Sequence, residues 1–297
     1  MTITFSRRQA IAGALLAIPA VSALAGSAGA ATGSTVEKRL AELEGRHKGR
    51  IGVAIHNLAT GARFGHRADE RFLMCSTFKA LLAAHILARV DGKEEALDRR
   101  IVAKKSDLSE WSPVVEKRIG GKGISIAELC EATITLSDNA AANLLLAASG
   151  GPKAVTAFLR GIGDDATRLD RPEPALNYHE TPDDERDTTT PVAMAETLHR
   201  LIIGDALSRS SKAQLAAWLV MNKTGDARLR AGFPASWTTG DKTGTNGNKH
   251  GNANDIAVTW TPDRGAIIVT AFCEIPGISG DERNAVIAEI GRIAVEG

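Results

Sequence analysis

Ser76 and Lys79 carry the clearest chemical potential in this sequence, within the segment Cys75-Ser76-Thr77-Phe78-Lys79. The apolar run that follows predicts a helix, and helical positions three apart share one face, so hydroxyl and amine can meet. A serine hydroxyl becomes nucleophilic when a base takes its proton, and a partly desolvated amine can be that base. Unpaired N–H groups of a first helical turn suit a developing oxyanion. By itself, however, the pair indicates no more than a helix cap followed by a surface lysine.

Ser137-Asp138-Asn139 lies between two predicted helices and places a hydroxyl, a carboxylate and an amide on one turn. A second hydroxyl near Ser76 could relay a proton to a leaving nitrogen. The same residue types are also favoured as simple helix caps, so this motif alone leaves both interpretations open.

The tripeptide Lys-Thr-Gly occurs twice, at residues 223–225 and 242–244. The first copy follows a predicted helix over residues 213–221, so we interpret it as a helix exit with glycine near the C-cap. The second copy continues a predicted strand from Trp237. That strand can place Lys242 and Thr243 along the wall of a site, and glycine there lets a ligand approach the backbone.

The elements that must position these residues form a clear order along the chain. Strand patterns occur only near the two ends, which predicts one sheet built from both termini around a helical centre. The predicted strands cover residues 50–57, 62–66, 237–243, 256–261 and 266–272. The predicted helices include residues 36–43, 129–136, 139–148 and 281–294. The second of these follows the capping box Ser125-x-x-Glu128, and Pro152 and Pro191 each open a further helix.

Composition limits the partners that we expect. The 297 residues, 43% of them hydrophobic, can form a large core in one or two domains. Without Arg7 and Arg8, 34 basic residues face 35 acidic ones, so the net charge predicts no field for nucleic acid or an anionic membrane. Three cysteines make no disulfide framework, and seven scattered histidines show no metal-ligand spacing. We therefore expect no metal and no cofactor.

Residues 1–30 are predicted to be an export signal. Ser6-Arg7-Arg8-Gln9 precedes an Ala- and Leu-rich stretch, and Ala28-Gly29-Ala30 is typical of a cleavage site. The paired arginines indicate the twin-arginine route, with general secretion as the alternative. An uncleaved membrane anchor fits less well, because Pro19 and the glycines interrupt the apolar run. We expect a periplasmic protein with no membrane contact after signal removal.

The motifs Ser-x-x-Lys, Ser-Asp-Asn and Lys-Thr-Gly, in this order, resemble those of the class A serine β-lactamases. A fourth stretch, from Arg171 to Asn177 and closing at Asp184–Asp187, resembles the Ω-loop of that family. The resemblance extends from Val36 to the last helix. It implies an α/β (α+β) fold with a five-stranded antiparallel sheet flanked by helices, comprising residues 31–68 and 220–297, and an all-helical second domain over residues 69–219. It also implies an Arg171–Asp187 pair and a cis Glu173–Pro174 bond.

The resemblance implies hydrolysis of penicillins and cephalosporins by a monomer, conferring antibiotic resistance. Ser76 would attack the β-lactam carbonyl, with the backbone N–H groups of Ser76 and Thr245 as the oxyanion hole. Lys79 and Glu173 would handle the serine proton, and which of them acts during acylation stays open. Ser137 would return the proton to the ring nitrogen, and Glu173 and Asn177 would bind the hydrolytic water. The substrate carboxylate would be bound by Lys242, Thr243 and Arg228. Asn139 would bind the substrate amide, and Trp111 would form an apolar wall at the entrance.

Two other classes remain in view, a penicillin-binding D,D-peptidase and a non-catalytic β-lactam receptor. Glu173 with Asn177 argues against both, because those proteins deacylate slowly or stop after one turnover. The sequence also departs from some family members in its cysteines. Asn246 stands where the partner of Cys75 would be, and Ala83 stands where the partner of Cys130 would be.

Because Cys75 and Cys130 lack these partners, we predict that all three cysteines are free thiols. Thiol titration under denaturing conditions should therefore count three, and a reductant should hardly change the melting temperature. A count of one would contradict this prediction, because it would mean that two of the three cysteines are joined in a disulfide.

Overall fold

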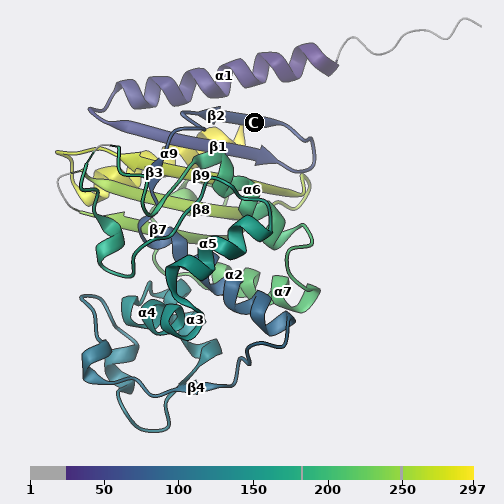
Figure 1. Cartoon of the computed structure of the whole chain (residues 1–297). Coiled ribbons are helices and arrows are strands. Elements are labelled where there is room, and N and C mark those ends of the chain that lie inside the picture. The colour runs from purple at the N-terminus through teal and green to yellow at the C-terminus, as the bar shows by residue number, and fades with distance from the viewer. Residues whose placement is uncertain (1–24, 182, 248–249) are drawn as a thin grey trace, which may run out of the picture.

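A five-stranded antiparallel sheet forms the centre of the structure, a computed structural model that describes residues 25–181, 183–247 and 250–297. The strand order is β2-β1-β9-β8-β7, so N-terminal and C-terminal segments lie side by side, as predicted (Figure 1). The strands are β1 (Arg50–Asn57), β2 (Arg63–His66), β7 (Thr238–Asn246), β8 (Asn252–Trp260) and β9 (Ala266–Glu274). The site motif Lys-Thr-Gly therefore lies on an edge strand, β7.

Each face of the sheet packs against helices through its own apolar cluster. One cluster joins the sheet to α1 (Ala25–Gly45), α8 (Leu229–Gly232) and α9 (Gly280–Val295). The other cluster joins the opposite face to the helical region, which lies below the sheet in Figure 1. The helices of that region are α2 (Phe78–Asp91), α3 (Ile126–Thr135), α4 (Asn139–Ala148), α5 (Gly151–Gly161), α6 (Pro191–Ile202) and α7 (Arg209–Val220). The core is thus continuous from sheet to helices, and the division at residues 68/69 and 219/220 stays a prediction.

Two strands extend beyond their predicted ends because their polar residues have partners in neighbouring segments. β8 begins at Asn252, four residues before the predicted Ile256. Asn254 is 1% exposed and donates to the carbonyl oxygens of Leu73 and Met74 at 2.8 and 3.1 Å. The pattern Asn-Ala-Asn-Asp is typical of a loop, and only these tertiary contacts make it a strand. β7 likewise continues through Thr245 to Asn246.

Helix caps place the turn that carries Ser137. The predicted capping box is present, since the Ser125 hydroxyl accepts from Glu128 N and Glu128 accepts from Ser125 N. After α3 ends, Asp138 caps α4 by accepting from Ala141 N at 2.9 Å. Its other carboxylate oxygen accepts from the backbone N–H groups of Val114 and Val115. Asp138 is fully buried, so this carboxylate fixes the turn and faces no solvent.

Four two-residue strands also occur between residues 69 and 219, where only helices were predicted. β3 (Phe72–Leu73) pairs with β6 (Thr188–Thr189), which ties the end of the predicted Ω-loop to the segment before Ser76. β4 (Arg100–Ile101) pairs with β5 (Ile124–Ser125). Such short ladders have no periodic signal, because a pattern of period two needs more residues to be seen.

The N-terminal signal prediction concerns residues that are mostly outside the described part of the chain. Residues 1–24, including the arginine pair, are not described, and α1 starts at Ala25, eleven residues before the predicted helix start. Among the described residues, none of the helices has the length and apolarity needed to cross a bilayer.

Candidate active site

Ser76 lies in a single 3-10 turn, Cys75–Thr77, directly before α2. The residue before it, Cys75, has a φ of 46°, a value that costs energy for any residue with a side chain. The turn also packs closely on β7, because a Cβ atom on Gly244 would lie 2.6 Å from the Met74 carbonyl oxygen. Glycine in Lys242-Thr243-Gly244 is therefore required so that the strand and the serine turn can touch.

Lys79, the second residue of α2, meets the serine as the sequence predicted. Its Nζ lies 2.9 Å from Ser76 Oγ and 3.1 Å from Glu173 Oε1. It also donates to Asn139 Oδ1 at 2.5 Å and to the Ser137 carbonyl oxygen at 2.9 Å. Lys79 is fully buried, and burial lowers its pKa below the ordinary lysine value, against the opposing effect of the Glu173 carboxylate. Burial therefore favours the neutral amine that a base requires.

Glu173 reaches the same point from the loop after α5. Its Oε1 accepts from Ser76 Oγ at 3.1 Å, and its Oε2 accepts from Asn177 Nδ2 at 2.6 Å. Asn143 of α4 holds the backbone of Glu173 from both sides, accepting from its N–H at 3.0 Å and donating to its C=O at 2.9 Å. Asn177 Oδ1 is buried and has no hydrogen-bond partner among the described residues. This oxygen is available to a bound water molecule.

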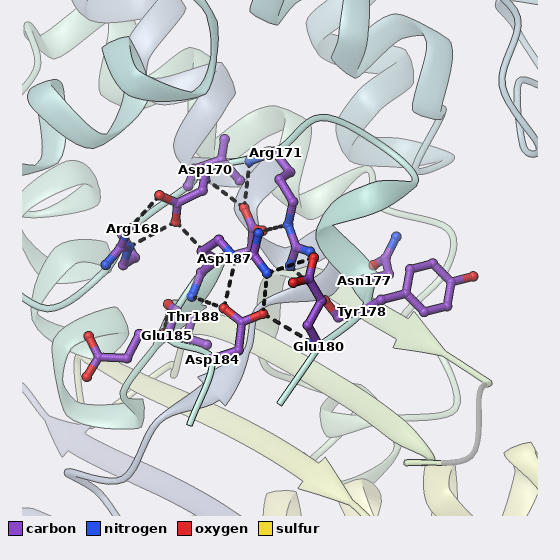
Figure 2. Close-up of polar contacts among 12 residues, drawn as sticks. Arg168, Asp170, Arg171, Asn177, Tyr178, Glu180, Asp184, Glu185, Asp187 and Thr188 are labelled. Atoms are coloured by element: carbon purple, nitrogen blue, oxygen red, sulfur yellow. Dashed lines mark hydrogen bonds and ion pairs between the residues drawn. The ribbon is translucent and has the colours of Figure 1, made fainter. Parts of the chain in front are cut away.

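The neck of the loop is a network of carboxylates and backbone N–H groups (Figure 2). Arg171 Nε donates to Asp187 Oδ2 at 2.6 Å, and Asp187 Oδ1 accepts from the backbone N–H groups of Asp170 and Arg171. Nearby, Asp184 accepts from Arg186 Nε at 2.9 Å and from Arg186 Nη2 at 2.8 Å. The predicted Arg171–Asp187 pair and the predicted cis Glu173–Pro174 bond are both present. The neck therefore brings the two ends of the loop together.

Ser137 and Lys242 face Lys79 across the cleft. Ser137 has a φ of 56°, and its Oγ lies 3.3 Å from Lys79 Nζ and 3.2 Å from Lys242 Nζ. Lys242 is fully buried in β7 and also donates to the Thr243 carbonyl oxygen at 2.8 Å. Burial and the nearby Lys79 lower the pKa of Lys242 to about 7. One hydroxyl thus lies between two amines.

Arg228 joins this wall from behind the strand. Its guanidinium donates to Thr245 Oγ1 at 2.6 Å and to the carbonyl oxygens of Gly244 and Asn254 at 2.9 and 2.6 Å. The residue is only 7% exposed, so Arg228 is part of the buried wall and not a surface arginine. The hydroxyls of Thr243 and Thr224 lie 2.5 Å apart on the same wall.

Trp111 and Asn139 complete the entrance. Trp111 is 56% exposed and donates from Nε1 to the Leu136 carbonyl oxygen at 2.8 Å, so it lies on the rim and not in the core. The backbone N–H of Asn139 donates to the Trp111 carbonyl oxygen, which ties the rim to α4. The cleft has a volume of about 420 Å³ and is lined by Ser76, Glu110, Trp111, Ser137, Asn139, Glu173, Pro174, Asn177, Tyr178, Thr224, Arg228, Thr243, Thr245, Asn246 and Gly247.

Two residues at the site were missed in the sequence. Asn143 is a polar residue one helical turn after Asn139, and that spacing was the available signal. Thr224 belongs to the first Lys-Thr-Gly copy, which we interpreted as a helix exit. That interpretation is wrong in its detail: α7 ends at Val220, and Gly225 lies where a Cβ atom would collide with the Asp241 carboxylate. The first copy therefore supports the wall formed by the second.

No described cysteine or histidine lines the cleft. The three cysteines are buried free thiols. His85 is packed against Phe158, with Nε2 3.3 Å from the Ser149 carbonyl oxygen. Within the described ranges, no three His, Cys, Asp or Glu residues are grouped in a way that could hold a metal ion.

A serine held between a buried lysine and a buried glutamate, with cationic groups beside it, defines an enzyme of the serine acyl-transfer class. Comparison with known proteins specifies the family. Residues 35–297 match the profile of the "Beta-lactamase enzyme family". Beta-lactamase L2 of Stenotrophomonas maltophilia is 47% identical over 284 residues, covering 94% of this chain and 92% of that protein. Beta-lactamase OXY-2 of Klebsiella oxytoca is 43% identical, covering 96% and 97%.

Solved structures agree. An ancestral (GNCA) class A β-lactamase is 62% identical with a TM-score of 0.85, covering 88% of this chain and 99% of that one. The chain belongs to the β-lactamase enzyme family, in class A. It is a hydrolase of the β-lactam amide bond, the reaction that confers resistance to β-lactam antibiotics, and the D,D-peptidase and receptor alternatives are not favoured.

The low pKa of Lys242 predicts a dependence of stability on pH. An unfolded lysine has a pKa of about 10.4. Between about pH 7 and pH 10 the unfolded chain thus holds a proton that the folded protein releases. The free energy of unfolding should rise with pH in this window, by at most about 1.4 kcal/mol per pH unit from this group.

Urea denaturation between pH 7 and pH 10 measures this slope. Lys242→Gln should flatten it, whereas Lys223→Gln, an exposed lysine of the other Lys-Thr-Gly copy, should leave it unchanged. Equal slopes in the wild type and Lys242→Gln would show that Lys242 keeps an ordinary pKa in the folded protein.

Proposed function

We propose that Ser76 is the nucleophile that opens the β-lactam ring of penicillins and cephalosporins through an acyl-enzyme. The observation that carries this proposal is the position of Ser76 Oγ, which lies within 3.1 Å of both Lys79 Nζ and Glu173 Oε1. Two groups can thus receive its proton. Burial lowers the pKa of Lys79 and so favours its neutral form, and Glu173 Oε1 accepts the hydrogen bond from Ser76 Oγ.

The oxyanion hole in this proposal is formed by the backbone N–H groups of Ser76 and Thr245. β7 is the edge strand of the sheet, so backbone groups on its outer side have no strand partner and can face a ligand. The contact of Gly244 with the Met74 backbone brings that edge against the serine turn. Preorganised N–H donors of this kind stabilise the charge that develops in the tetrahedral state.

Ser137 then returns the proton to the departing ring nitrogen. Its hydroxyl lies within 3.3 Å of Lys79 Nζ, the group that can receive the serine proton, and within 3.2 Å of Lys242 Nζ. A proton can therefore pass from Lys79 through Ser137 to the leaving group without crossing solvent.

Substrate binding uses the donors on the β7 wall. Thr243, Arg228 and Thr245 line the cleft with cationic and hydroxyl donors that match a carboxylate, and the buried Lys242 lies directly behind them, with Nζ 3.2 Å from Ser137 Oγ. Asn139 already accepts from Lys79 through its Oδ1, which leaves its amide N–H₂ for the substrate side-chain amide. The exposed Trp111 ring provides an apolar surface at the entrance.

Arg228→Ala should chiefly weaken the capture of carboxylate-bearing substrates. A charge-assisted hydrogen bond contributes about 1.5–3 kcal/mol, so kcat/KM should fall on the order of ten- to a hundredfold. Because Arg228 also satisfies two buried carbonyl oxygens, the melting temperature should fall as well. Steady-state kinetics well below that melting temperature separate the two effects, and an unchanged kcat/KM would place Arg228 outside the site.

Hydrolysis of the acyl-enzyme needs an activated water molecule, and we assign this role to Glu173 and Asn177. Glu173 lies beside Ser76, and Asn177 donates to Glu173 with Nδ2 while its Oδ1 stays open to a water proton. A water molecule bound to these groups would be held next to the ester carbon, as proximity and general-base catalysis require.

Glu173→Ala should convert continuous turnover of a chromogenic cephalosporin into at most a stoichiometric burst. Positioned general-base catalysis contributes roughly 10²–10⁴-fold, so hydrolysis should slow by at least that order. Intact-mass spectrometry should show a long-lived adduct, and Ser76→Ala should show none. Asp183→Ala, which changes an exposed carboxylate of the same loop, should turn over as the wild type does. Turnover of Glu173→Ala at the wild-type rate would place the deacylating base elsewhere.

Export to the periplasm belongs to the same proposal and rests on the sequence pattern of residues 1–30. Cleavage after Ala30 would leave most of α1, including its buried residues Val36, Leu40 and Leu43, in the mature protein. A monomer suffices for activity, because one chain supplies every residue of the cleft. The proposed domain division places the cleft between residues 69–219 and the sheet.

A further inference from the structure

A second charged feature of the molecule lies away from the cleft, at the end of the helical region opposite α1 (Figure 1). Residues 99–123 contain seven Lys and Arg against three Asp and Glu, although the whole chain has a formal net charge of only +1. The near-neutral total hid this concentration, because the rest of the chain carries a compensating negative excess. Electrostatic attraction of anions is therefore a property of this end of the molecule. The molecule as a whole, being nearly neutral, does not attract them.

The backbone brings two parts of this segment together. The β4–β5 ladder pairs Ile101 with Ile124, and Gly120 N donates to the Ala103 carbonyl oxygen at 2.9 Å. Between them a hollow of about 490 Å³ is lined by Arg100, Lys117, Arg118, Ile119, Gly120, Gly121, Lys122 and Gly123. It shares no lining residue with the active-site cleft.

The arginines of this hollow differ in their partners from the lysines in it and beside it. Arg100 and Arg118 both pair with Glu128, at 3.4 and 3.1 Å, which holds them at the surface. Lys104, Lys117 and Lys122 are exposed, and within the described chain none of their ammonium groups forms an ion pair. Three cations are thus free to meet external anions.

Two large aliphatic side chains lie among these cations. Val102 is 52% exposed and Ile119 is 41% exposed, each next to the Ala103–Gly120 hydrogen bond that joins the two segments. Val102, Ile119 and Ile203 are the large exposed aliphatics among the described residues, apart from Met221. Apolar side chains within a basic surface match a bilayer interface, where anionic headgroups lie above acyl chains.

We propose that this basic face, defined as Arg100, Val102, Lys104, Lys117, Arg118, Ile119 and Lys122, docks reversibly on a bilayer containing anionic phospholipid. The cations meet the phosphate groups, and Val102 and Ile119 enter the interface. A free phosphate ion would use the hollow but not the aliphatic side chains. A nucleic acid would use the charge, but the face has no aromatic side chain on which bases could stack.

Vesicle co-sedimentation tests the proposal, using protein purified after export with identical N-termini confirmed by intact mass. The probe is vesicles of phosphatidylcholine with about a quarter phosphatidylglycerol, compared with phosphatidylcholine alone. Wild-type protein should bind the anionic vesicles at low salt. Raising the salt toward 0.5 M should release it, because the Debye length there is only ~4 Å and the charges are screened.

The partition coefficient of the patch variant Lys104→Gln/Lys117→Gln/Lys122→Gln onto the anionic vesicles should be on the order of a hundredfold lower. This follows because each lost cation should weaken binding by roughly a factor of five. The matched control Lys38→Gln/Lys48→Gln/Lys153→Gln removes three exposed lysines elsewhere and should bind as the wild type does. Val102→Ser/Ile119→Ser should also weaken binding while leaving the charge unchanged. Cephalosporin turnover should be the same in all these variants, which shows that each is folded.

Three outcomes would overturn the proposal. Wild-type protein could stay in the supernatant with anionic vesicles at low salt, or the patch variant and the control could bind equally. Alternatively, inorganic phosphate at millimolar concentration could bind the hollow while vesicles do not, which would make the face a small-anion site. None of these outcomes would affect the roles of Ser76 and Glu173, because turnover is measured separately.

Discussion

The ion pair between Lys79 and Glu173 is the constraint on which the rest of the site depends. Both side chains are almost fully buried, at 0% and 1% exposure, and their charged atoms lie 3.1 Å apart. Burying two charges costs several kcal/mol per ion unless the remaining donors and acceptors are satisfied. Asn139 and Ser137 satisfy Lys79, and Asn177 satisfies Glu173. The pair therefore holds α2, α4 and the Ω-loop in one arrangement around the serine.

Two further buried carboxylates hold the backbone where these elements leave regular structure. Asp138 accepts from three backbone N–H groups and fixes the turn with Ser137, while Asp187 accepts from two and fixes the loop neck. Ser137 and Asp187 both have positive φ values, which persist only where the surroundings determine them. Both carboxylates thus act as backbone anchors, whereas Glu173 is the carboxylate that accepts from Ser76 Oγ.

The sheet contributes an edge and a set of buried polar residues. Arg228, Asn254 and Asp255 are all at most 7% exposed, and they join α8 and the segment before Ser76 to β7 and β8. These contacts explain why a polar sequence forms a long strand. They also place Lys242 in a dry environment beside Lys79, where its pKa falls to about 7. The burial that packs the sheet therefore also lowers the pKa of Lys242.

The sequence by itself determined the motifs, their order, and the helices and strands with strong periodicity. The strand Arg50–Asn57 and the helix Asn139–Ala148 were predicted to the residue, because apolar period and capping residues specify them locally. The family resemblance identified the Ω-loop, and its paired neck and cis bond are present. Only the tertiary structure decided the contacts of Asn143 and Thr224 and the start of β8. Each of these depends on contacts between segments far apart in the chain, and such contacts leave no periodic signal in the sequence.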